Sequence, residues 1–453
     1  MRVCHGFTAV FDDPNLVSCA GLAPVLRVAE RAGLQDLVAG RVRIDKPGGG
    51  NAELKVSGLV AGMVAGADSI DDLGLLRHGG MRRLFGGVRA PSTLGTFLRG
   101  FTFGHVRQLD AVASRLLVNL SRAAPLLPGA AELAYVDLDD TVRQTYGYAK
   151  QGAGRGYTGV KGLNALLAVV STPSSAPVIA AARLRKGSTH SARGAARLAA
   201  DALVTAKAAG ATGVRVLRAD SAFYGYDVIA AAIRQRSCFS ITARQDSAIR
   251  RAIATINPQA WTPIKYPNAI FEEDQQRWIS DAEVAEIGYT AFTSQPKAKH
   301  VTARLIVRRV KDLNPNHQNE LFPAYRYHAV FTNSPLPMLA AEAAHRGHAI
   351  IEQVIADLKN GPLAHLPSGK FAANSAWLVC ATMAFNLTRA AGALASAFHA
   401  KATTGTIRAQ LINVPARLAR SARRLTVHLP TAWPWEQAWR RMLTQANAPP
   451  PTT

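Results

Sequence analysis

The sequence has few of the features that mark secreted, zinc-binding or membrane proteins. Its four cysteines, none in a Cys-x-x-Cys or mixed Cys/His spacing, predict isolated reduced thiols in a cytosolic protein without a zinc finger. Residues 1–30 lack the basic-then-apolar order of a signal peptide. The longest run without a charge, 371–388, carries several polar residues, so it predicts a buried helix and not a membrane span.

Acidic residues are scarce beside basic ones. The 453 residues include 53 Lys and Arg against 30 Asp and Glu, a formal net charge of +23. An excess of this size predicts a polyanionic partner, most often a nucleic acid. An anionic membrane surface is the weaker interpretation, because no basic amphipathic helix stands out near a terminus. The 48% hydrophobic content is enough for a sizeable core and excludes a disordered chain.

Residues 1–130 are predicted to be mainly helical, with helix-like apolar spacing over 21–33, 51–66, 69–78 and 92–124. Arginines spread along this part indicate a helical N-terminal DNA-binding region. A helical packing domain with a solvated basic face explains the same pattern. No firm helix-turn-helix signature separates the two interpretations.

From residue 131 the pattern becomes that of an α/β domain. Strand, strand, strand, helix, strand, helix, strand follow one another up to residue 245, which is the order of an RNase H-like core, a mixed sheet flanked by helices. Residues 246–324 are predicted to form a β-rich insertion domain. Residues 325–399 would supply the second part of the core, and residues 400–453 a basic C-terminal segment with interleaved tryptophans.

Three acidic residues lie at positions suited to chemistry on phosphodiesters. Asp139 falls in the first predicted core strand, on the same face as Asp137, and Asp220 ends the fourth. If residues 345–359 form a helix, His345, His348, Glu352 and Lys359 lie on one narrow stripe. The Glu352 carboxylate would then lie among the three basic residues. The alternative for this stretch is an ordinary amphipathic surface helix. Asp140 points to the opposite face from Asp137 and Asp139 and is interpreted as a polar cap at the strand end.

These carboxylates predict a site for two Mg²⁺ ions, with Mn²⁺ as a substitute. Hard divalent cations take oxygen ligands, and two ions about 3.5–4 Å apart can activate the attacking oxygen and stabilise the leaving 3′ oxygen. Asp139 would bridge both ions, Asp220 would lie beside it, and Glu352 would complete the second ion. The carboxylates are separated by 81 and 132 residues, and the second interval has room for the insertion.

A glycine-rich segment, 147–157, follows the first strand without the order of a phosphate-binding P-loop. Arg155 and the nearby Lys161 are candidates for contacts with DNA phosphates. Such loops are also often plain connectors.

In combination, several motifs resemble those of DDE transposases of bacterial insertion sequences, in the family numbered 1380. The stretches that carry this resemblance over nearly the whole chain are VDLDDTV at 136–142, LRADSAFY at 217–224, HRGHAIIEQVIADLK at 345–359, NLVS at 15–18 and FAANSAW at 371–377. The wider class has a Tyr-x2-Arg-x3-Glu-x6-Lys signature. Glu352 and Lys359 match it, whereas His345 and His348 replace its tyrosine and arginine.

The resemblance implies metal-dependent cleavage at inverted-repeat ends and strand transfer into target DNA by a cut-and-paste route. It also implies a homodimer on DNA, with no membrane partner, in the bacterial cytoplasm at the nucleoid. It favours Asp139 over Asp137, because the family's aspartate lies two residues before the threonine that Thr141 matches. Asp137 would then support the ligand from behind. His345, His348 and Lys359 would contact DNA phosphates, although neutral packing histidines and a solvated lysine remain alternatives.

Two other functions stay open at the level of sequence. One is a sequence-specific DNA-binding protein derived from a transposase, without catalysis. The presence of all three carboxylates argues against it. The other is a structure-specific nuclease on the same core, which would cleave DNA without joining ends to a target.

Overall fold

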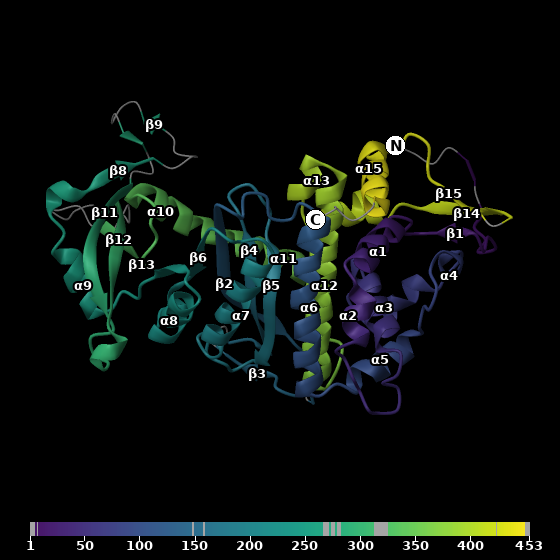
Figure 1. The fold of residues 1–453 in the computed structure, drawn as a ribbon, viewed down its shortest axis with the longest axis horizontal. Coiled ribbons are helices and arrows are strands. Elements are labelled where there is room, and N and C mark those ends of the chain that lie inside the picture. Colours follow the sequence, from purple (N-terminus) through teal and green to yellow (C-terminus); the bar gives the residue numbers. More distant parts are fainter. Residues whose placement is uncertain are drawn as a thin grey trace. The chain divides into compact units, whose positions relative to one another are not determined.

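A computed structural model describes residues 5–6, 8–146, 149–156, 159–265, 271–272, 277–278, 282–311, 325–422 and 424–448 (Figure 1). The chain divides into two compact units, and each is described by itself. The helical unit comprises residues 1–126 and 357–453, and the sheet unit comprises residues 127–356. The division near residue 126 lies close to the predicted boundary. The predicted second part of the core, 325–399, is in contrast divided after residue 356.

The helical unit is built around one long helix, α12 (Phe371–Ala395). Helices from both ends of the chain pack on it, notably α1, α3, α5, α6 and α15. Its helices are α1 (Leu22–Arg31), α2 (Leu34–Ala39), α3 (Ala52–Ala65), α4 (Met81–Leu84), α5 (Pro91–Arg99), α6 (Phe103–Ala123), α12, α13 (Ala397–Lys401), α14 (Thr404–Ile407) and α15 (Glu436–Asn447), with 3₁₀ turn η1 (Asp71–Leu76). A small sheet joins β1 (Leu16–Val17), β14 (Ala416–Ser421) and β15 (Arg424–His428) in that order.

Helix α12 is predominantly apolar and nearly all of its residues are buried, which explains why it occupies the centre. It is the one helix among the described residues that is long and apolar enough to cross a membrane, and 94% of its most apolar window is buried inside the protein. A core helix passes the same test of length and composition. The sequence-based prediction of a buried helix here is therefore confirmed, and the helix extends beyond the charge-free stretch to Ala395.

The predicted helix over 92–124 is two helices. Helix α5 ends at Arg99, and α6 begins after Thr102. Thr102 and His105 form a reciprocal capping box, in which each side chain satisfies the other's backbone N–H. The break exists because this cap starts a new helix, a local feature that apolar spacing does not reveal.

The sheet unit contains one large mixed sheet. Its strands lie in the order β3-β4-β2-β6-β7-β13-β12-β11-β8, and β5 pairs with β4 outside this path. Their bounds are β2 (Leu133–Gln144), β3 (Gly154–Arg155), β4 (Lys161–Ser171), β5 (Val178–Lys186), β6 (Val214–Ala219), β7 (Cys238–Thr242), β8 (Thr262–Ile264), β11 (Ala282–Ala291), β12 (Val301–Lys311) and β13 (Tyr325–Thr332). A separate two-stranded ladder joins β9 (Phe271–Glu272) and β10 (Arg277–Trp278).

The first half of this sheet has the predicted succession of elements. Strand β2 is antiparallel to β4 and parallel to β6, and β6 is parallel to β7. Helix α7 (Ala195–Ala208) connects β5 to β6, and helix α8 (Tyr226–Arg234) connects β6 to β7. Parallel strands need such crossovers, which is why a helix separates β6 from β7 in the sequence. The chain therefore has a mixed α/β fold with a large sheet and packed helices.

The segment predicted as an inserted domain extends the sheet. Strand β13 pairs antiparallel with β7 on one side and with β12 on the other, so β12, β11 and β8 continue the sheet outward. The strands β8, β11 and β12 of the segment predicted as an insertion therefore lie in the same sheet as β7 and β13 of the predicted core. The part of the insertion between 312 and 324 lies outside the described residues.

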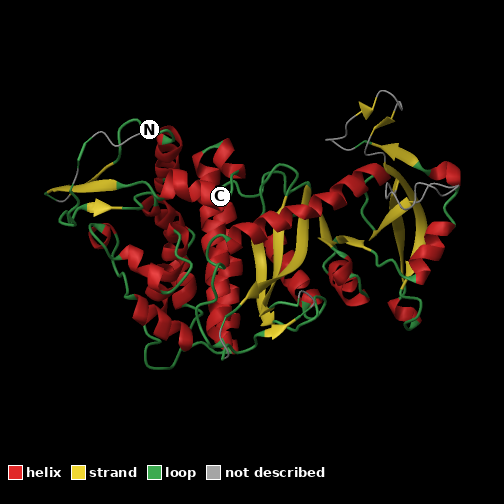
Figure 2. Cartoon of the chain, turned by 180° about the vertical axis from the view of Figure 1, so that it is seen from behind, coloured by secondary structure: helices red, strands yellow, loops and turns green. Residues whose placement is uncertain are grey.

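Helices lie on the sheet unit's faces. Helix α7 packs on β5, β4 and β2, and helix α10 (Met338–Arg346) packs on β11 and β12. The run from α10 crosses in front of the strands when the chain is seen from behind (Figure 2). Apolar contact of Ala341 with Val284 and Ile306 holds α10 down. The C-terminal end of α10, which carries His345 and Arg346, lies close to β6, because Arg218 of β6 donates to the carbonyl of Ala344.

Candidate functional site

Two of the predicted carboxylates leave neighbouring parallel strands at the same level. The register of β2 and β6 pairs Asp137 with Arg218 and Leu138 with Ala219, so Asp139 and Asp220 are the next residues in line. Strand β6 ends there, and Asp220 caps the short turn that follows by accepting from the N–H of Ala222 at 2.9 Å. Carboxyl ends of parallel strands are a frequent place for ligands in open sheets. The structure thus brings Asp139 and Asp220 together.

Asp137, the rival to Asp139, is fully engaged inside the protein. It is 0% exposed, and Arg218 donates to both of its oxygens, from Nε at 2.6 Å and from Nη2 at 2.7 Å. His348 Nδ1 also lies 3.0 Å from Asp137 Oδ1. Because an ionised carboxylate only accepts, this ring nitrogen carries the proton. A carboxylate held in this way has little capacity left for a metal ion.

Asp140 is engaged on the opposite face of β2, as strand alternation requires. It forms a buried ion pair with Arg185 and accepts from Asn164 Nδ2 at 2.8 Å. Arg185 also donates to the carbonyls of Ser191 and Arg193, at 2.7 and 2.8 Å, in the segment that leads into α7. The prediction that Asp140 caps a strand end is wrong, because β2 continues to Gln144 and Asp140 is a core ion-pair partner.

Asp139 differs from both of its neighbours. It is partly exposed, it accepts the N–H of Asp140 at 2.7 Å, and no basic side chain among the described residues forms an ion pair with it. Burial raises its pKa to about 6, and the carboxylates of Asp220 and Asp140 add to this, while the Asp140 N–H and His348 oppose it. Burial also raises the pKa of Asp220, with Asp140 contributing. Two adjacent carboxylates that repel each other make a strongly cation-seeking site.

His345 does not face a ligand. The ring is buried, with Nδ1 3.0 Å from Ser240 Oγ and Nε2 2.9 Å from Thr242 Oγ1, both on β7. Burial lowers its pKa to about 3, and the nearby His348 and Arg218 act in the same direction. His345 is therefore a neutral packing residue that fastens the end of α10 to β7, which is the alternative that the sequence leaves open.

The stretch predicted as one helix has a tighter turn inside it. Helix α10 ends at Arg346, a 3₁₀ turn η6 covers Gly347–Ala349, and α11 covers Ile350–Lys359. The 3₁₀ turn rotates side chains away from the 100° spacing, so His345 and Glu352 do not share one continuous stripe. His345 and His348 stack at 6.5 Å between ring centroids.

Glu352 lies in the first turn of α11 and is exposed. Within the described part of the chain its side chain forms no ion pair or hydrogen bond. Nor does any group of three or more His, Cys, Asp or Glu residues there form a cluster able to hold a metal ion. The structure therefore joins the two aspartates and leaves the glutamate outside a formed cluster.

Two other candidate DNA contacts, Arg155 and Lys161, lie apart from the aspartates along the sheet. Arg155 and Lys161 are paired across β3 and β4. Lys161 is six residues along β4 from Leu167, the partner of Asp139, which corresponds to about 20 Å of strand. Arg155 Nη1 donates to the carbonyl of Gly159 at 2.9 Å. Lys359 is the last residue of α11.

Sequence reasoning missed Arg218 and Arg185. Arg218 lies two residues before Asp220 in the same motif, a position that places both side chains on one face of β6. Its guanidinium stacks on Tyr135, with Cζ 3.9 Å from the ring centroid, and it donates to the carbonyl of Ala344 in α10. Arginines inside predicted core strands were the available signal, since buried arginines need partners.

The donor set fits a hard divalent cation. Asp139 and Asp220 supply anionic oxygens with raised pKa values, and two flanking carboxylates are already neutralised by arginines. A cation between Asp139 and Asp220 would relieve their mutual repulsion. Of the acidic residues of α11, the exposed Glu352 lies closest in sequence to His348 and the turn η6.

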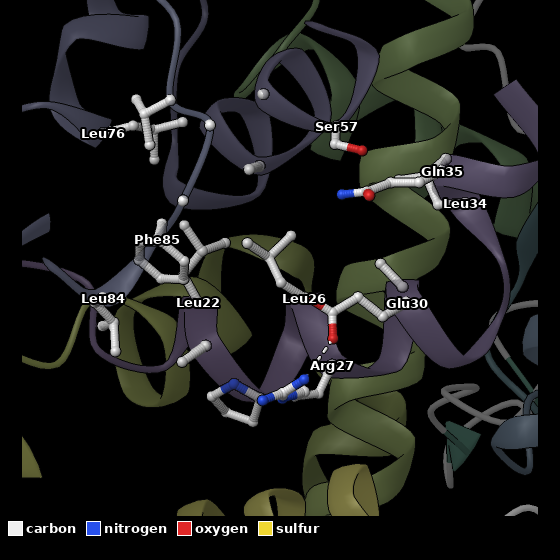
Figure 3. Close-up of a pocket in the computed structure, with 18 of the residues that line it drawn as sticks. Leu22, Leu26, Arg27, Glu30, Leu34, Gln35, Ser57, Leu76, Leu84 and Phe85 are labelled. Carbon is white, nitrogen blue, oxygen red and sulfur yellow. Dashed lines mark hydrogen bonds and ion pairs between the residues drawn. The ribbon is translucent and has the colours of Figure 1, made fainter. Parts of the chain in front are cut away.

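A pocket of about 490 Å³ lies in the helical unit (Figure 3). Its walls are mainly apolar, formed by residues such as Leu22, Leu26, Leu34 and Phe85, and the Arg27–Glu30 ion pair at 2.8 Å lies at its edge. Glu30 is the single carboxylate among its described lining residues.

Comparison with known proteins gives a family match over most of the chain. The family described as "Transposase DDE domain group 1" matches residues 6–449. No curated protein matches the sequence.

Proposed function

Because this chain belongs to the family of transposase DDE domains, we propose that it is an active DNA transposase whose carboxylates are Asp139, Asp220 and Glu352. The reaction would be cleavage at inverted-repeat ends followed by strand transfer into target DNA, by a cut-and-paste route. The motif resemblance to insertion-sequence family 1380 supports this finer assignment.

One observation carries the proposal: of the three aspartates on β2, only Asp139 lacks a basic partner among the described residues. Asp137 and Asp140 each form a buried ion pair with an arginine, on opposite faces of the strand. Asp139 remains beside Asp220 with a pKa raised to about 6. A carboxylate kept free of cations at such a position is suited to bind a metal ion, and this supports Asp139 over Asp137.

Asp139, Asp220 and Glu352 would hold two Mg²⁺ ions, or Mn²⁺ in their place. When bound there, such ions activate the attacking oxygen and stabilise the leaving 3′ oxygen. The chain's own contribution is to supply anionic oxygens and to keep the arginines turned away from them. Glu352 completes the set by approaching the aspartates when metal and DNA are present.

Phosphate contacts are proposed for Lys359, Lys161 and Arg155. For His348, a phosphate contact through Nε2 is the alternative to a positioning role. His348 uses Nδ1 for Asp137, and its Nε2 has no partner among the described residues. Lys161 and Arg155, about 20 Å along β4, suit DNA that flanks the scissile bond. His345 is not retained as a DNA contact, because both of its ring nitrogens are engaged in the core.

The partners proposed with this function are the inverted-repeat ends and target DNA, bound by a homodimer in the bacterial cytoplasm at the nucleoid. The net charge of +23 supports a DNA partner. The number of chains on DNA is measurable by light scattering of the purified complex.

The test uses the full chain with DNA that carries the inverted repeats flanking its gene. Cleavage and joining to a plasmid are measured with Mg²⁺ for the wild type and for Asp139→Asn, Asp220→Asn and Glu352→Gln. Asp227→Asn is the matched control, since Asp227 is an exposed aspartate of the same unit. Each carboxylate variant should lose cleavage and joining while still binding the ends, and the control should behave as the wild type.

Three results would overturn the proposal. Robust cleavage by Glu352→Gln would remove the glutamate from the site. A wild type that binds the ends but never cleaves them would favour the DNA-binding protein without catalysis. Cleavage without joining would instead favour the nuclease.

A further inference from the structure

We propose that Asp137, Arg218 and His348 form a positioning triad. The triad would fix the positions of the Asp139, Asp220 and Glu352 carboxylates relative to one another. The proposal rests on the proposed function and assigns the triad no direct contact with metal or DNA. Its role would be to fix the metal site through the backbone of three elements.

The geometry of the triad links β2, β6 and the α10–η6 segment through one buried group. Arg218 on β6 holds both oxygens of Asp137 on β2 at 2.6 and 2.7 Å. The same guanidinium donates to the carbonyl of Ala344 in α10. From η6, His348 reaches Asp137 Oδ1 at 3.0 Å. Every connection is a charged hydrogen bond or reaches a charged group, and Arg218 is only 3% exposed.

Each member of the triad precedes one candidate ligand by a short, fixed length of chain. Asp137 lies two residues before Asp139, and Arg218 lies two residues before Asp220, in extended strands that keep the side chains on one face. His348 lies four residues before Glu352, about one helical turn. A shift of the triad therefore moves all three carboxylates relative to one another.

The triad itself is unsuited to bind the metal. Asp137 is fully buried and its charge is balanced by Arg218, so its oxygens face protein donors. Hydrogen bonds that support metal ligands from behind typically change metal affinity or activity about 10–100-fold when removed. The triad would act less directly, by fixing the positions of the strands and the helix that carry the ligands.

His348 offers the cleanest test, because its removal leaves the buried Asp137–Arg218 pair intact. His348→Asn keeps a donor near the place of Nδ1 but removes Nε2, whereas His348→Ala removes both. His365→Ala is the control, since His365 is an exposed histidine with one carboxylate partner, Asp68 at 3.0 Å. Mn²⁺ affinity of the full chains is measured by calorimetry without DNA, together with thermal unfolding and metal-free binding to the inverted-repeat ends.

The positioning role predicts that His348→Ala weakens Mn²⁺ binding roughly 10-fold or more. His348→Asn should restore most of the affinity, and His365→Ala should not change it. Metal-free DNA binding should be the same in all four proteins. If His348→Ala bound Mn²⁺ as tightly as the wild type, the positioning role would be wrong. If His348→Asn were as weak as His348→Ala and both failed to bind DNA, Nε2 would be a DNA contact instead.

A second variant tests the triad from β6. Arg218→Lys keeps the charge that balances Asp137 but removes the fork that reaches Asp137 and Ala344 together. It should also weaken Mn²⁺ binding at a temperature where the protein is folded, and unchanged affinity would contradict the proposal. Asp139→Asn separates the two levels of inference. If Mn²⁺ binding required neither Asp139 nor His348, the proposed function would fail with the triad, but a requirement for Asp139 alone would overturn only the triad.

Discussion

Asp137 and Arg218 face each other in the parallel register of β2 and β6 and form a doubly hydrogen-bonded ion pair in the core. Two residues further along the same strands, Asp139 and Asp220 form a pair of like charges. The same register therefore produces a balanced pair and an unbalanced one. The contrast explains how one strand can hold a structural aspartate and a candidate metal ligand two positions apart.

The first prediction is that Asp137→Asn and Asp139→Asn have opposite effects on stability. Asp137→Asn leaves Arg218 as a buried charge without its counterion, which should lower the free energy of unfolding by about 3–5 kcal/mol. Asp139→Asn removes a repelled carboxylate and should leave stability unchanged or raise it, by at most about 3 kcal/mol. Urea denaturation in metal-free buffer measures both. An equal loss in the two variants would contradict the different roles assigned to them.

The pairing of Asp139 with Asp220 could be predicted from sequence because it depends on local signals. Alternation within a strand places Asp139, and the order of elements places β2 beside β6. The ion pairs of Asp137 and Asp140 could not be predicted, because Arg218 and Arg185 reach them across strands distant in the chain. Without its partner Arg185 in view, Asp140 resembles a polar residue at a strand end, although β2 continues to Gln144.

Sequence pattern alone does not show how the predicted β-rich insertion pairs with the core. Its strands β8, β11 and β12 look like a separate β-rich module, but the pairing of β12 with β13 of the predicted core is a long-range choice. Helix α12 is predominantly apolar, so its sequence predicts burial without saying against which helices. The 3₁₀ turn at Gly347–Ala349 is a local deviation that a regular 100° helix cannot represent.

The second prediction concerns the pH dependence that Asp139 confers on stability. Its pKa rises from 3.8 to about 6 on folding, so the folded state binds the proton more tightly than the unfolded state. The wild type should therefore gain stability relative to Asp139→Asn as the pH falls from about 6 to about 4, and the difference should be flat above about pH 7. Denaturation of both proteins between about pH 4 and 8 without metal gives this difference directly.

At about pH 7.5 the same two proteins should respond differently to Mg²⁺. Binding to the folded state alone stabilises a protein in proportion to the logarithm of ligand concentration. Added Mg²⁺ should raise the melting temperature of the wild type and have little effect on Asp139→Asn. Equal stabilisation of both would place the metal elsewhere.

The third prediction has the opposite sign and concerns His345. Its pKa falls from 6.5 to about 3 on folding, so the unfolded state takes up the proton first as the pH drops. The wild type should lose stability relative to His345→Gln by about 1.4 kcal/mol for each pH unit below about 6.5. Denaturation between about pH 5 and 8 measures it, and a histidine that titrated normally would show no such loss.

The last prediction separates two faces of the basic hairpin β14–β15. Directly paired residues of antiparallel strands share a face, so Arg424, the partner of Ser421, lies on the same side as Arg417. Arg420 lies on the opposite side with the buried Leu418. The arginines of this segment therefore do not all lie on one face of the hairpin. Arg423, which belongs to the same run, lies outside the described residues.

If the side of Arg417 and Arg424 contacts DNA phosphates, Arg417→Gln with Arg424→Gln should weaken binding to all duplex sequences alike. The slope of log affinity against log salt should become shallower by up to about 0.9 for each phosphate that is no longer neutralised. Arg420→Gln is the matched control and should change neither quantity. Arg417 already pairs with Asp13 at 3.2 Å, and its side chain is 62% exposed. This ion pair should hide part of its effect on DNA binding, so Arg417→Gln should have a larger effect in an Asp13→Asn background, where Arg417 is free. A loss confined to one DNA sequence would contradict a backbone contact, and an effect of Arg420→Gln alone would place the contact on the other face.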